Sequence, residues 1–423
     1  MPEAPFLYKQ NARVLSASLA GTAVEFYDFY IYATAAALVF GPLFFPAESA
    51  SAQLLAAYAS FAVAFIARPI GALAFGHFGD RVGRKSTLVA SLLIMGLSTF
   101  FIAFLPGHEA IGWLAPLLLC VLRFGQGFGL GGEWGGAALL AVENAPDGWR
   151  GRFGMFPQFG APLGFIAANG LFLGLGLWLS DAEFQAWGWR VPFLGSILLV
   201  AIGLWVRLRL TETPAFEAAL AEAPPAKVPL VELLRDHLGQ TLVGVFGVVA
   251  CFALFYVSTA FALGHATTAM GFAREAVLMV QLGAILFLAL GIWLAGILSD
   301  RFSPRVVLIG GSAAGMLAGL LMAPLMGMGL AGLAVFLALA LFAMGFVYGP
   351  LGAWLPGLFP ARVRYTGASL AFNAGGIIGG GLTPVVAQAL VGEFGLVAVG
   401  LWVVVACGAS LVTLLGFARD RQA

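Results

Sequence analysis

Charge is the feature that this sequence has least of. Charged residues make up 10% of its 423 positions, against roughly 25% in a typical soluble domain. So few ionised side chains cannot coat a water-facing surface, which excludes a soluble globular protein. Hydrophobic residues make up 61% of the chain, and this composition predicts an integral membrane protein embedded in a lipid bilayer.

Motifs for covalent chemistry, cofactors and metals are also missing. The three cysteines, Cys120, Cys251 and Cys407, lie in apolar runs and have neither metal-ligand spacing nor a disulfide framework. The sequence has no nucleotide-binding loop, serine nucleophile motif or His/Cys/Glu cluster. Basic residues are scattered in short loops, so nucleic acid has no support as a partner. We expect no enzyme, no cofactor and no metal site.

Long apolar runs take the place of these motifs. A membrane-spanning helix needs about 20 residues, whereas barrel strands alternate and are about half as long. The sequence therefore predicts an all-α membrane protein with twelve transmembrane helices. Their approximate ranges are 14–41, 53–76, 86–105, 112–142, 151–179, 188–211, 239–264, 274–298, 306–326, 329–357, 363–392 and 394–417.

The basic residues orient these spans. Seventeen of the 21 Lys and Arg residues lie near the two ends of the chain or in the loops that follow even-numbered spans. By the positive-inside rule, both termini are predicted to be cytoplasmic. An odd number of spans would break this pattern, so the charge bias supports twelve spans independently of hydropathy.

The chain also divides into two similar halves. We expect an N-terminal half at residues 1–211 and a C-terminal half at 239–423. Between them we expect a cytoplasmic linker at 212–238 that holds a short amphipathic helix. The stretch "GHFGDRVGRK" follows the second span, and "GILSDRFSPR" follows the eighth. This repeat predicts two pseudo-symmetric six-helix halves, an organisation typical of secondary transporters.

Two acids interrupt the first apolar span, "GTAVEFYDFYIYATAAALVF". A carboxylate at the centre of a membrane helix costs roughly 2.5–3.5 kcal/mol on insertion scales, yet Glu25 and Asp28 lie one turn apart on one face. Two acids so close repel each other, so we expect the face to line an aqueous path and one acid to hold a proton for part of a cycle. The sequence does not decide which acid that is.

A buried arginine in the fourth span supplies a counter-ion. At 1.5 Å per residue, Asp28 lies about 21 Å above the start of its span and Arg123 about 16 Å below the start of its own. Both fall near the middle of a core about 30 Å thick. We predict that Asp28 and Arg123 form a proton-dependent pair; the alternative is a static pair that only fixes packing. Glu133 is either a second proton relay or the neutralising partner of Arg68 or a loop cation.

"GHFGDRVGRK" resembles the signature loop of the major facilitator superfamily, between the second and third helices. In that family the loop latches the outward-facing state. The resemblance implies that Asp80 has Glu143 and Arg150 or Arg152 as partners. Ser303 and Pro304 depart from the pattern in the second copy, which is therefore expected to be weaker. The predicted latch comprises Gly76, Asp80, Arg81, Gly83, Arg84, Glu143, Arg150, Arg152, Asp300 and Arg301.

A second resemblance narrows the family. "RFGQGFGLGGEWGG", "WGWRVPFLGSILLVAIGLWVRLRLTETPAF" and "RVRYTGASLAFNAGG" resemble the metabolite:proton symporter subfamily. Its members carry dicarboxylates, tricarboxylates, shikimate-like acids, or proline and betaines, together with protons. The resemblance implies a monomeric carrier in the bacterial inner membrane.

The expected function is proton-coupled symport of a small organic acid by alternating access. The alternative is a zwitterionic osmolyte, proline or betaine, whose cationic end stacks on Tyr27, Tyr30 or Trp134. Drug efflux is less favoured, because "FPQFGAPLGF" has Ala161-Pro162 where efflux antiporters usually have Gly-Pro. Candidate substrate-binding residues are Arg123, Tyr27, Gln126, Trp134, Tyr256 and Asn373.

Overall fold

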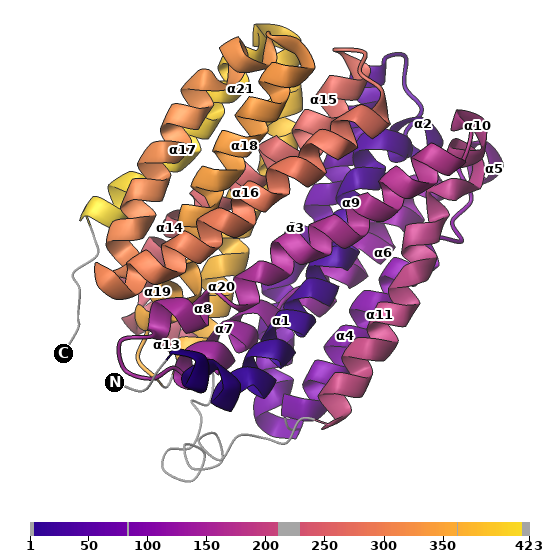
Figure 1. Cartoon of the computed structure of the whole chain (residues 1–423). Helices are drawn as coiled ribbons and strands as arrows, with labels where there is room; N and C mark the ends of the chain where they lie inside the picture. Colours follow the sequence, from indigo (N-terminus) through magenta and orange to yellow (C-terminus); the bar gives the residue numbers. More distant parts are fainter. Residues whose placement is uncertain (1–3, 83, 210–228, 362, 417–423) are drawn as a thin grey trace.

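A computed structural model describes residues 4–82, 84–209, 229–361 and 363–416. These residues form helices joined by short turns, and none of them lies in a strand (Figure 1). The all-α prediction is therefore confirmed for the described chain. The last residues of the predicted N-terminal half and most of the linker, 210–228, lie outside these ranges. The described end of the linker forms the short helix α13 (Pro229–Asp236).

Helices α1 to α11 make up the first six spans. They are α1 (Ala4–Ala35), the π-helix η1 (Ala36–Phe40), α2 (Gly41–Phe44), α3 (Ala50–Val82), α4 (Arg84–Ile102), α5 (His108–Ile111), α6 (Leu114–Leu130), α7 (Glu133–Glu143), α8 (Arg150–Gly154), the 3₁₀ turn η2 (Pro157–Phe159), α9 (Gly160–Trp178), α10 (Asp181–Glu183), the π-helix η3 (Phe184–Gly188) and α11 (Arg190–Arg209).

Helices α14 to α21 make up the second six spans. They are α14 (Leu238–Tyr256), the π-helix η4 (Val257–Phe261), α15 (Ala262–Thr268), α16 (Arg274–Arg301), α17 (Pro304–Met326), α18 (Gly329–Tyr348), α19 (Leu351–Gly357), α20 (Arg364–Gly376), the π-helix η5 (Ile377–Gly381) and α21 (Leu382–Gly416). Gly395 breaks α21 with φ 75°, a left-handed conformation that glycine adopts without strain.

The twelve predicted spans are all found in these helices. Nine described helical segments are long and apolar enough to cross a membrane, and one of them, Arg364–Gly416, contains the eleventh and twelfth spans on either side of Gly395. The bent pair Asp181–Gly188 and Arg190–Trp205 supplies the sixth span, and α4, with its apolar stretch Val89–Ile102, supplies the third. The prediction of twelve is confirmed.

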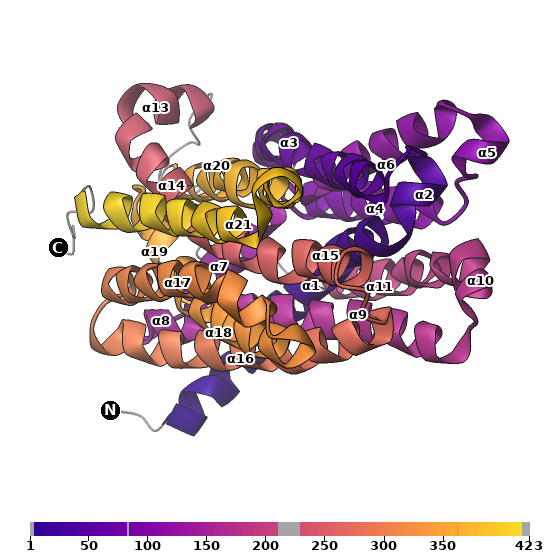
Figure 2. The same cartoon turned by 90° about the horizontal axis from the view of Figure 1, so that it is seen from above.

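The two sets of six spans lie on opposite sides of the bundle (Figures 1 and 2). Within the first set α3 and α4 pack on α6, and α1 packs on α9; within the second, α16 packs on α18 and α17 on α21. Helix α1 begins and α21 ends at the same end of the bundle (Figure 1). We call this the proximal end, and the opposite end the distal end.

Glycines allow α6 to approach its neighbours closely. A Cβ atom at Gly127 would collide with the carbonyl oxygen of Ala64 in α3, and one at Gly131 with the carbonyl oxygen of Arg68. Small residues at this spacing let helix backbones touch without side chains between them. This contact brings α3, and with it Arg68, beside α6.

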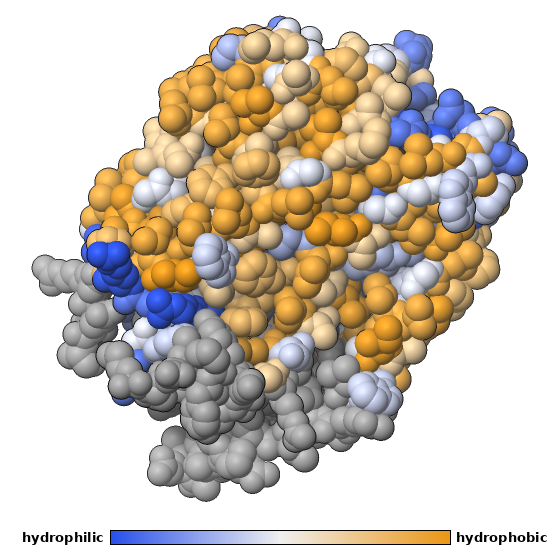
Figure 3. Space-filling model, viewed as in Figure 1, coloured by the Kyte–Doolittle hydropathy of each residue, from blue (hydrophilic) through white to orange (hydrophobic). Residues whose placement is uncertain are grey.

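The outer surface matches a membrane environment. Figure 3 shows apolar residues across the middle of one face, with hydrophilic residues gathered towards its two ends. Leu117, Leu286 and Val405, from three different helices, are among the exposed large apolar side chains. Contiguous apolar surface of this extent is not stable in water, so the chain is a multi-pass membrane protein.

Candidate transport site

Helix α1 presents one functional face to the interior of the first half. This face carries Glu25, Phe29 and Tyr32, which are spaced three or four residues apart, and Asp28 lies beside Phe29. All four side chains are buried. Glu25 and Asp28 are 3% and 0% exposed. The aqueous path predicted along this face is closed in this conformation.

Arg123 of α6 is enclosed by aromatic rings. Its guanidinium carbon lies 4.1 Å from the ring centre of Phe29, 4.0 Å from that of Tyr32 and 4.7 Å from that of Phe61. Ring faces attract a cation more strongly when both are removed from water. The arginine also donates from Nη1 to Oε1 of Gln126, so its charge is stabilised without a carboxylate in contact.

Gln126 connects Arg123 to the backbone at Asp28. Its Nε2 donates to the carbonyl oxygen of Asp28 at 2.8 Å and to Oγ1 of Thr99 at 2.8 Å. The structure therefore places Asp28 and Arg123 in one neighbourhood, as the depth argument predicted. Within the described chain no ion pair joins their side chains in this conformation, because Gln126 and the rings hold the guanidinium.

Arg68 of α3 has the acid partner that Arg123 lacks. It lies 4.0 Å from Glu25, with both side chains almost fully buried, and its guanidinium carbon is 4.4 Å from the centre of the Phe29 ring. Phe29 thus contacts both guanidinium groups. The sequence named Arg68 only as a possible partner of Glu133, whereas its partner in the structure is Glu25.

Glu133, the first residue of α7, is 6% exposed and accepts a hydrogen bond from Oγ of Ser91 in α4 at 3.0 Å. Three acids and two arginines are therefore buried in the first half. They are the only charged side chains that are buried among the described residues: Glu25, Asp28, Arg68, Arg123 and Glu133.

Three of the predicted substrate-binding residues make structural contacts. The hydroxyl of Tyr27 donates to the carbonyl oxygen of Pro192 in α11. Trp134 stacks on Phe372 of α20 at 3.8 Å between ring centres, and Asn373 donates from Nδ2 to the carbonyl oxygen of Gly131 at 2.7 Å. In this conformation Tyr27 packs α1 on α11, while Trp134 and Asn373 join the two halves.

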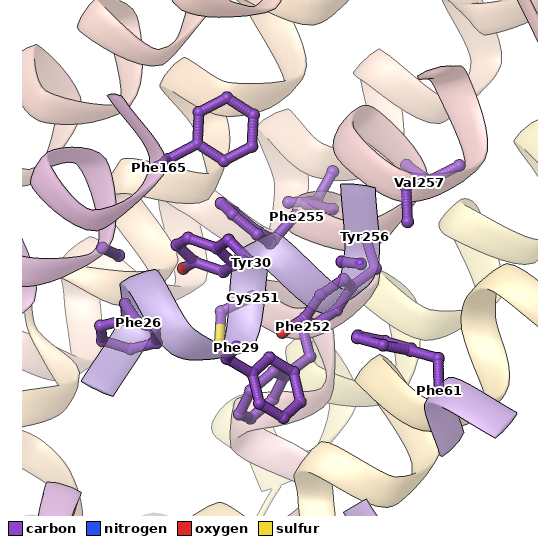
Figure 4. Close-up of a cluster of buried hydrophobic side chains, with 14 of the residues drawn as sticks. Phe26, Phe29, Tyr30, Phe61, Phe165, Cys251, Phe252, Phe255, Tyr256 and Val257 are labelled. Carbon is purple, nitrogen blue, oxygen red and sulfur yellow. The ribbon is translucent and has the colours of Figure 1, made fainter. Parts of the chain in front are cut away.

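An aromatic cavity lies between the halves, and Tyr256 lines it. Its volume is about 20 Å³ for a water-sized sphere, enough for roughly one water molecule. Figure 4 shows part of its lining from both halves. The seven rings around it are Phe26, Tyr30, Phe252, Phe255, Tyr256, Tyr348 and Phe372.

The proximal end is closed by Asp300, at the end of α16. Its carboxylate accepts from the backbone N–H groups of Gly151 at 2.5 Å and Arg152 at 3.2 Å, and pairs with the Arg152 side chain at 3.3 Å. A carboxylate at a helix N-terminus is favoured by the helix dipole. Asp300 belongs to the second copy of the signature motif, which the sequence led us to expect to be the weaker one. It makes all three contacts, because capping the N-terminus of α8 requires only the aspartate and not the glycine and arginine that Ser303 and Pro304 replace.

Other predicted latch residues divide into two groups. Glu143, Arg150 and Arg301 are exposed at the proximal end. Arg152, which the sequence assigned to the first copy of the motif, contacts the second. Gly83, the surroundings of Gly76, and the side chains of Asp80, Arg81 and Arg84 lie outside the described part of the structure.

The distal end is closed by the N-terminal end of α16, the helix whose C-terminal end carries Asp300. Arg274, the first residue of α16, pairs with Asp181 at 2.9 Å and lies 3.9 Å from the centre of the Phe184 ring in η3. Tyr58 of α3 also donates to the carbonyl oxygen of Ala260 at 2.6 Å. Helix α16 therefore holds the first half at both of its ends, and the cavity is occluded.

We expect the proximal contacts of Asp300 and the distal contacts of Arg274 to restrain opposite openings of the carrier. Asp300→Asn loses the ion pair and weakens the helix cap, which together contribute about 1 kcal/mol. The population open at the proximal end should rise about fivefold. Maleimide labelling of Ser369→Cys, which faces Gly135 of the other half, measures this in a chain lacking Cys120, Cys251 and Cys407. Asp181→Asn is the distal control and should not increase labelling; an unchanged rate in Asp300→Asn contradicts the assignment.

Twelve spans in two sets, an occluded cavity between them and closing contacts at both ends define a transporter of the alternating-access class. The comparisons with known proteins agree. The chain belongs to the major facilitator superfamily, since residues 14–227 match the family described as "Sugar (and other) transporter". It is a metabolite transporter and not an enzyme.

Curated relatives are similar over nearly the whole chain. The inner membrane metabolite transport protein YhjE of Escherichia coli is 49% identical, in an alignment that covers 95% of this chain and 93% of that protein. The shikimate transporter of the same species is 38% identical, covering 97% and 95%. Its proline/betaine transporter is 32% identical, covering 90% and 77%. The crystal structure of a D-xylose-proton symporter has the same fold, with TM-score 0.72, 19% identity and coverage of 97% and 98%.

Proposed function

We propose that the chain is a proton-coupled symporter that carries a small organic acid across the bacterial inner membrane, as a monomer with both termini cytoplasmic. The halves at 1–211 and 239–423 rock about the central cavity, so that the proximal end opens to the cytoplasm and the distal end to the outside. The names of the relatives support a metabolite carrier, and the excess of basic residues in the even-numbered loops supports the orientation.

The balance of buried charge carries the proposal. Among the described residues three acids and two arginines are buried, one more buried acid than buried cation. An ionised carboxylate without a partner is strongly disfavoured in the membrane. Of the three, Asp28 has both oxygens without a hydrogen-bond partner in the described structure, while Glu25 has Arg68 and Glu133 has Ser91. Asp28 is therefore the acid that holds the proton in the occluded state.

Loss of this proton changes what Arg123 binds. Ionised Asp28 requires a cation, and Arg123 is connected to the same turn of α1 through Gln126. Protonation releases Arg123, whose Nε and Nη2 have no hydrogen-bond partner among the described residues. The freed guanidinium attracts the carboxylate of the substrate. Proton and anion then cross together with no net charge moved against the membrane potential.

The aromatic cavity favours a second candidate, a betaine. Seven rings surround the cavity, and cages of aromatic rings bind quaternary ammonium groups. Of the three residues expected to hold such a group, only Tyr30 lines this cavity. Tyr27 and Trp134 make the structural contacts described above.

Uptake into proteoliposomes tests the two candidates. We expect an inward proton gradient to drive accumulation of a radiolabelled hydroxylated carboxylate such as shikimate, and excess glycine betaine not to compete. Because one pH unit supplies about 1.4 kcal/mol per proton, accumulation should reach about tenfold at zero membrane potential. Accumulation of betaine, with no effect of the acids, would favour the second candidate. Accumulation without a gradient would contradict symport.

A further inference from the structure

A second, smaller cavity lies on the distal side of Tyr30. The Tyr30 ring separates it from the aromatic cavity, stacking at 4.9 Å on Phe255 and meeting Phe165 edge-on at 5.7 Å (Figure 4). Its volume is about 10 Å³ for a water-sized sphere. Both halves line it, so it must widen when they part. Its lining includes one hydroxyl and two amide side chains, those of Thr34, Asn169 and Gln281.

Gln281 of α16 supplies a fixed acceptor to this cavity. Its Nε2 donates to the carbonyl oxygens of Ser258 at 3.0 Å and Thr259 at 2.8 Å. Both residues lie in the π-helix η4, where the altered backbone register leaves carbonyl groups for other donors. These two bonds use both amide hydrogens. Oε1 of Gln281 cannot exchange places with Nε2, and it has no hydrogen-bond partner in the described structure.

Asn169 of α9 supplies a donor. Its Oδ1 accepts from Oγ1 of Thr34 at 2.5 Å. With the amide in this orientation, its nitrogen Nδ2 is the group left to donate. Asn169 and Gln281 are each 1% exposed, and a buried polar group without a partner costs free energy. The cavity thus joins an unpaired acceptor in one half to an available donor in the other.

A hydroxyl group matches this pair, because it donates one hydrogen bond and accepts another. A carboxylate only accepts, so it would be repelled by Oε1 of Gln281. A quaternary ammonium does neither. We propose that this cavity recognises a hydroxyl group of the substrate, which donates to Gln281 and accepts from Asn169. This inference rests on the proposed function, and it assigns the substrate class. The substrate is a carboxylic acid with a hydroxylated body, whose ring or chain lies against Tyr30.

The test compares one acid with its deoxygenated analogue. Shikimate and cyclohex-1-ene-1-carboxylate share the ring and the carboxyl group and differ in three hydroxyls. We expect the full-length wild-type protein to bind shikimate at least about tenfold more tightly by calorimetry. Gln281→Met and Asn169→Leu each preserve side-chain size and should reduce this ratio towards one, while affinity for the analogue changes by less than about twofold.

Gln388→Met is the matched control. Gln388 donates across the two halves, to Oγ of Ser51 at 3.0 Å, and its Oε1, like that of Gln281, lacks a partner among the described residues, but it lines neither cavity. Its substitution should preserve the ratio. Asn169→Leu leaves η4 intact, which keeps the test valid if Gln281→Met does not fold.

Two results would overturn the inference. One is equal binding of the two acids by the wild type, and the other is a parallel loss of both acids in Asn169→Leu. In either case uptake of the acids with protons would leave the proposed function standing. Binding of glycine betaine with no binding of either acid would overturn the proposed function as well.

Discussion

Asp28→Asn is expected to eliminate accumulation driven by a pH gradient while counterflow exchange persists. Asparagine resembles a protonated carboxyl group that can never lose its proton, so the carrier still exchanges substrate but cannot couple to the gradient. Where the wild type concentrates the acid about tenfold for each pH unit, the variant should only equilibrate it. Parallel measurements in proteoliposomes, one with a pH gradient and one with substrate preloaded inside, separate the two activities.

Glu133→Gln is the control for this prediction. Glu133 is also buried, but Ser91 donates to it, and the excess acid in our account is Asp28. We expect Glu133→Gln to retain at least half of the wild-type accumulation. Accumulation against a gradient by Asp28→Asn would show that another group carries the proton. Loss in Glu133→Gln with retention in Asp28→Asn would transfer the role to Glu133.

Arg123→Lys is expected to impair both activities. Lysine keeps the charge but cannot lie flat against Phe29, Tyr32 and Phe61 or fork towards Gln126. Lysine also cannot make the two parallel hydrogen bonds that a guanidinium gives to a carboxylate. Loss of one such hydrogen bond to the bound acid costs about 2 kcal/mol, so the affinity for the acid should fall about 30-fold. Counterflow and gradient-driven uptake should decline together, which distinguishes this variant from Asp28→Asn. Initial rates over a range of substrate concentrations measure the change.

Arg190 provides a matched control for Arg123. It lies 4.4 Å from the centre of the Trp189 ring and donates to the carbonyl oxygens of Ala103 and Leu105, but it is separate from the charged cluster. Arg190→Lys should leave the affinity within about twofold of wild type. Unchanged affinity and coupling in Arg123→Lys would make the arginine a packing residue.

The sequence predicted the spans and the buried charges well, because both depend on composition and depth. Twenty apolar residues in a row have few alternatives to a membrane helix, and an acid at mid-depth is visible as an exception. Asp28 and Arg123 were placed near each other by counting residues along two helices. Counting gives depth but not rotation or neighbours, and so it did not predict that Gln126 and three aromatic rings hold Arg123 in the occluded state.

The partner of Arg68 and the polar cavity were not predictable in the same way. Glu25 pairs with Arg68 because close contact at glycines brings α3 beside α6, and the sequence shows that such contacts exist without showing between which helices. The position of Gln281 depends on the π-helix η4, for which the residues Val257–Phe261 give no recognised signal. Arg68 itself did have a signal: it is one of two basic residues inside a predicted span.

The central claim is that Asp28 exchanges its proton for Arg123, and the most direct measurement is proton uptake on binding. In weakly buffered solution at an alkaline pH, where the open, substrate-free carrier has lost the Asp28 proton, the purified wild-type protein should take up as much as one proton for each acid molecule bound, because binding at Arg123 frees Asp28 to be protonated. Asp28→Asn should bind the acid with no proton uptake. Equal uptake by the variant and the wild type would contradict the account.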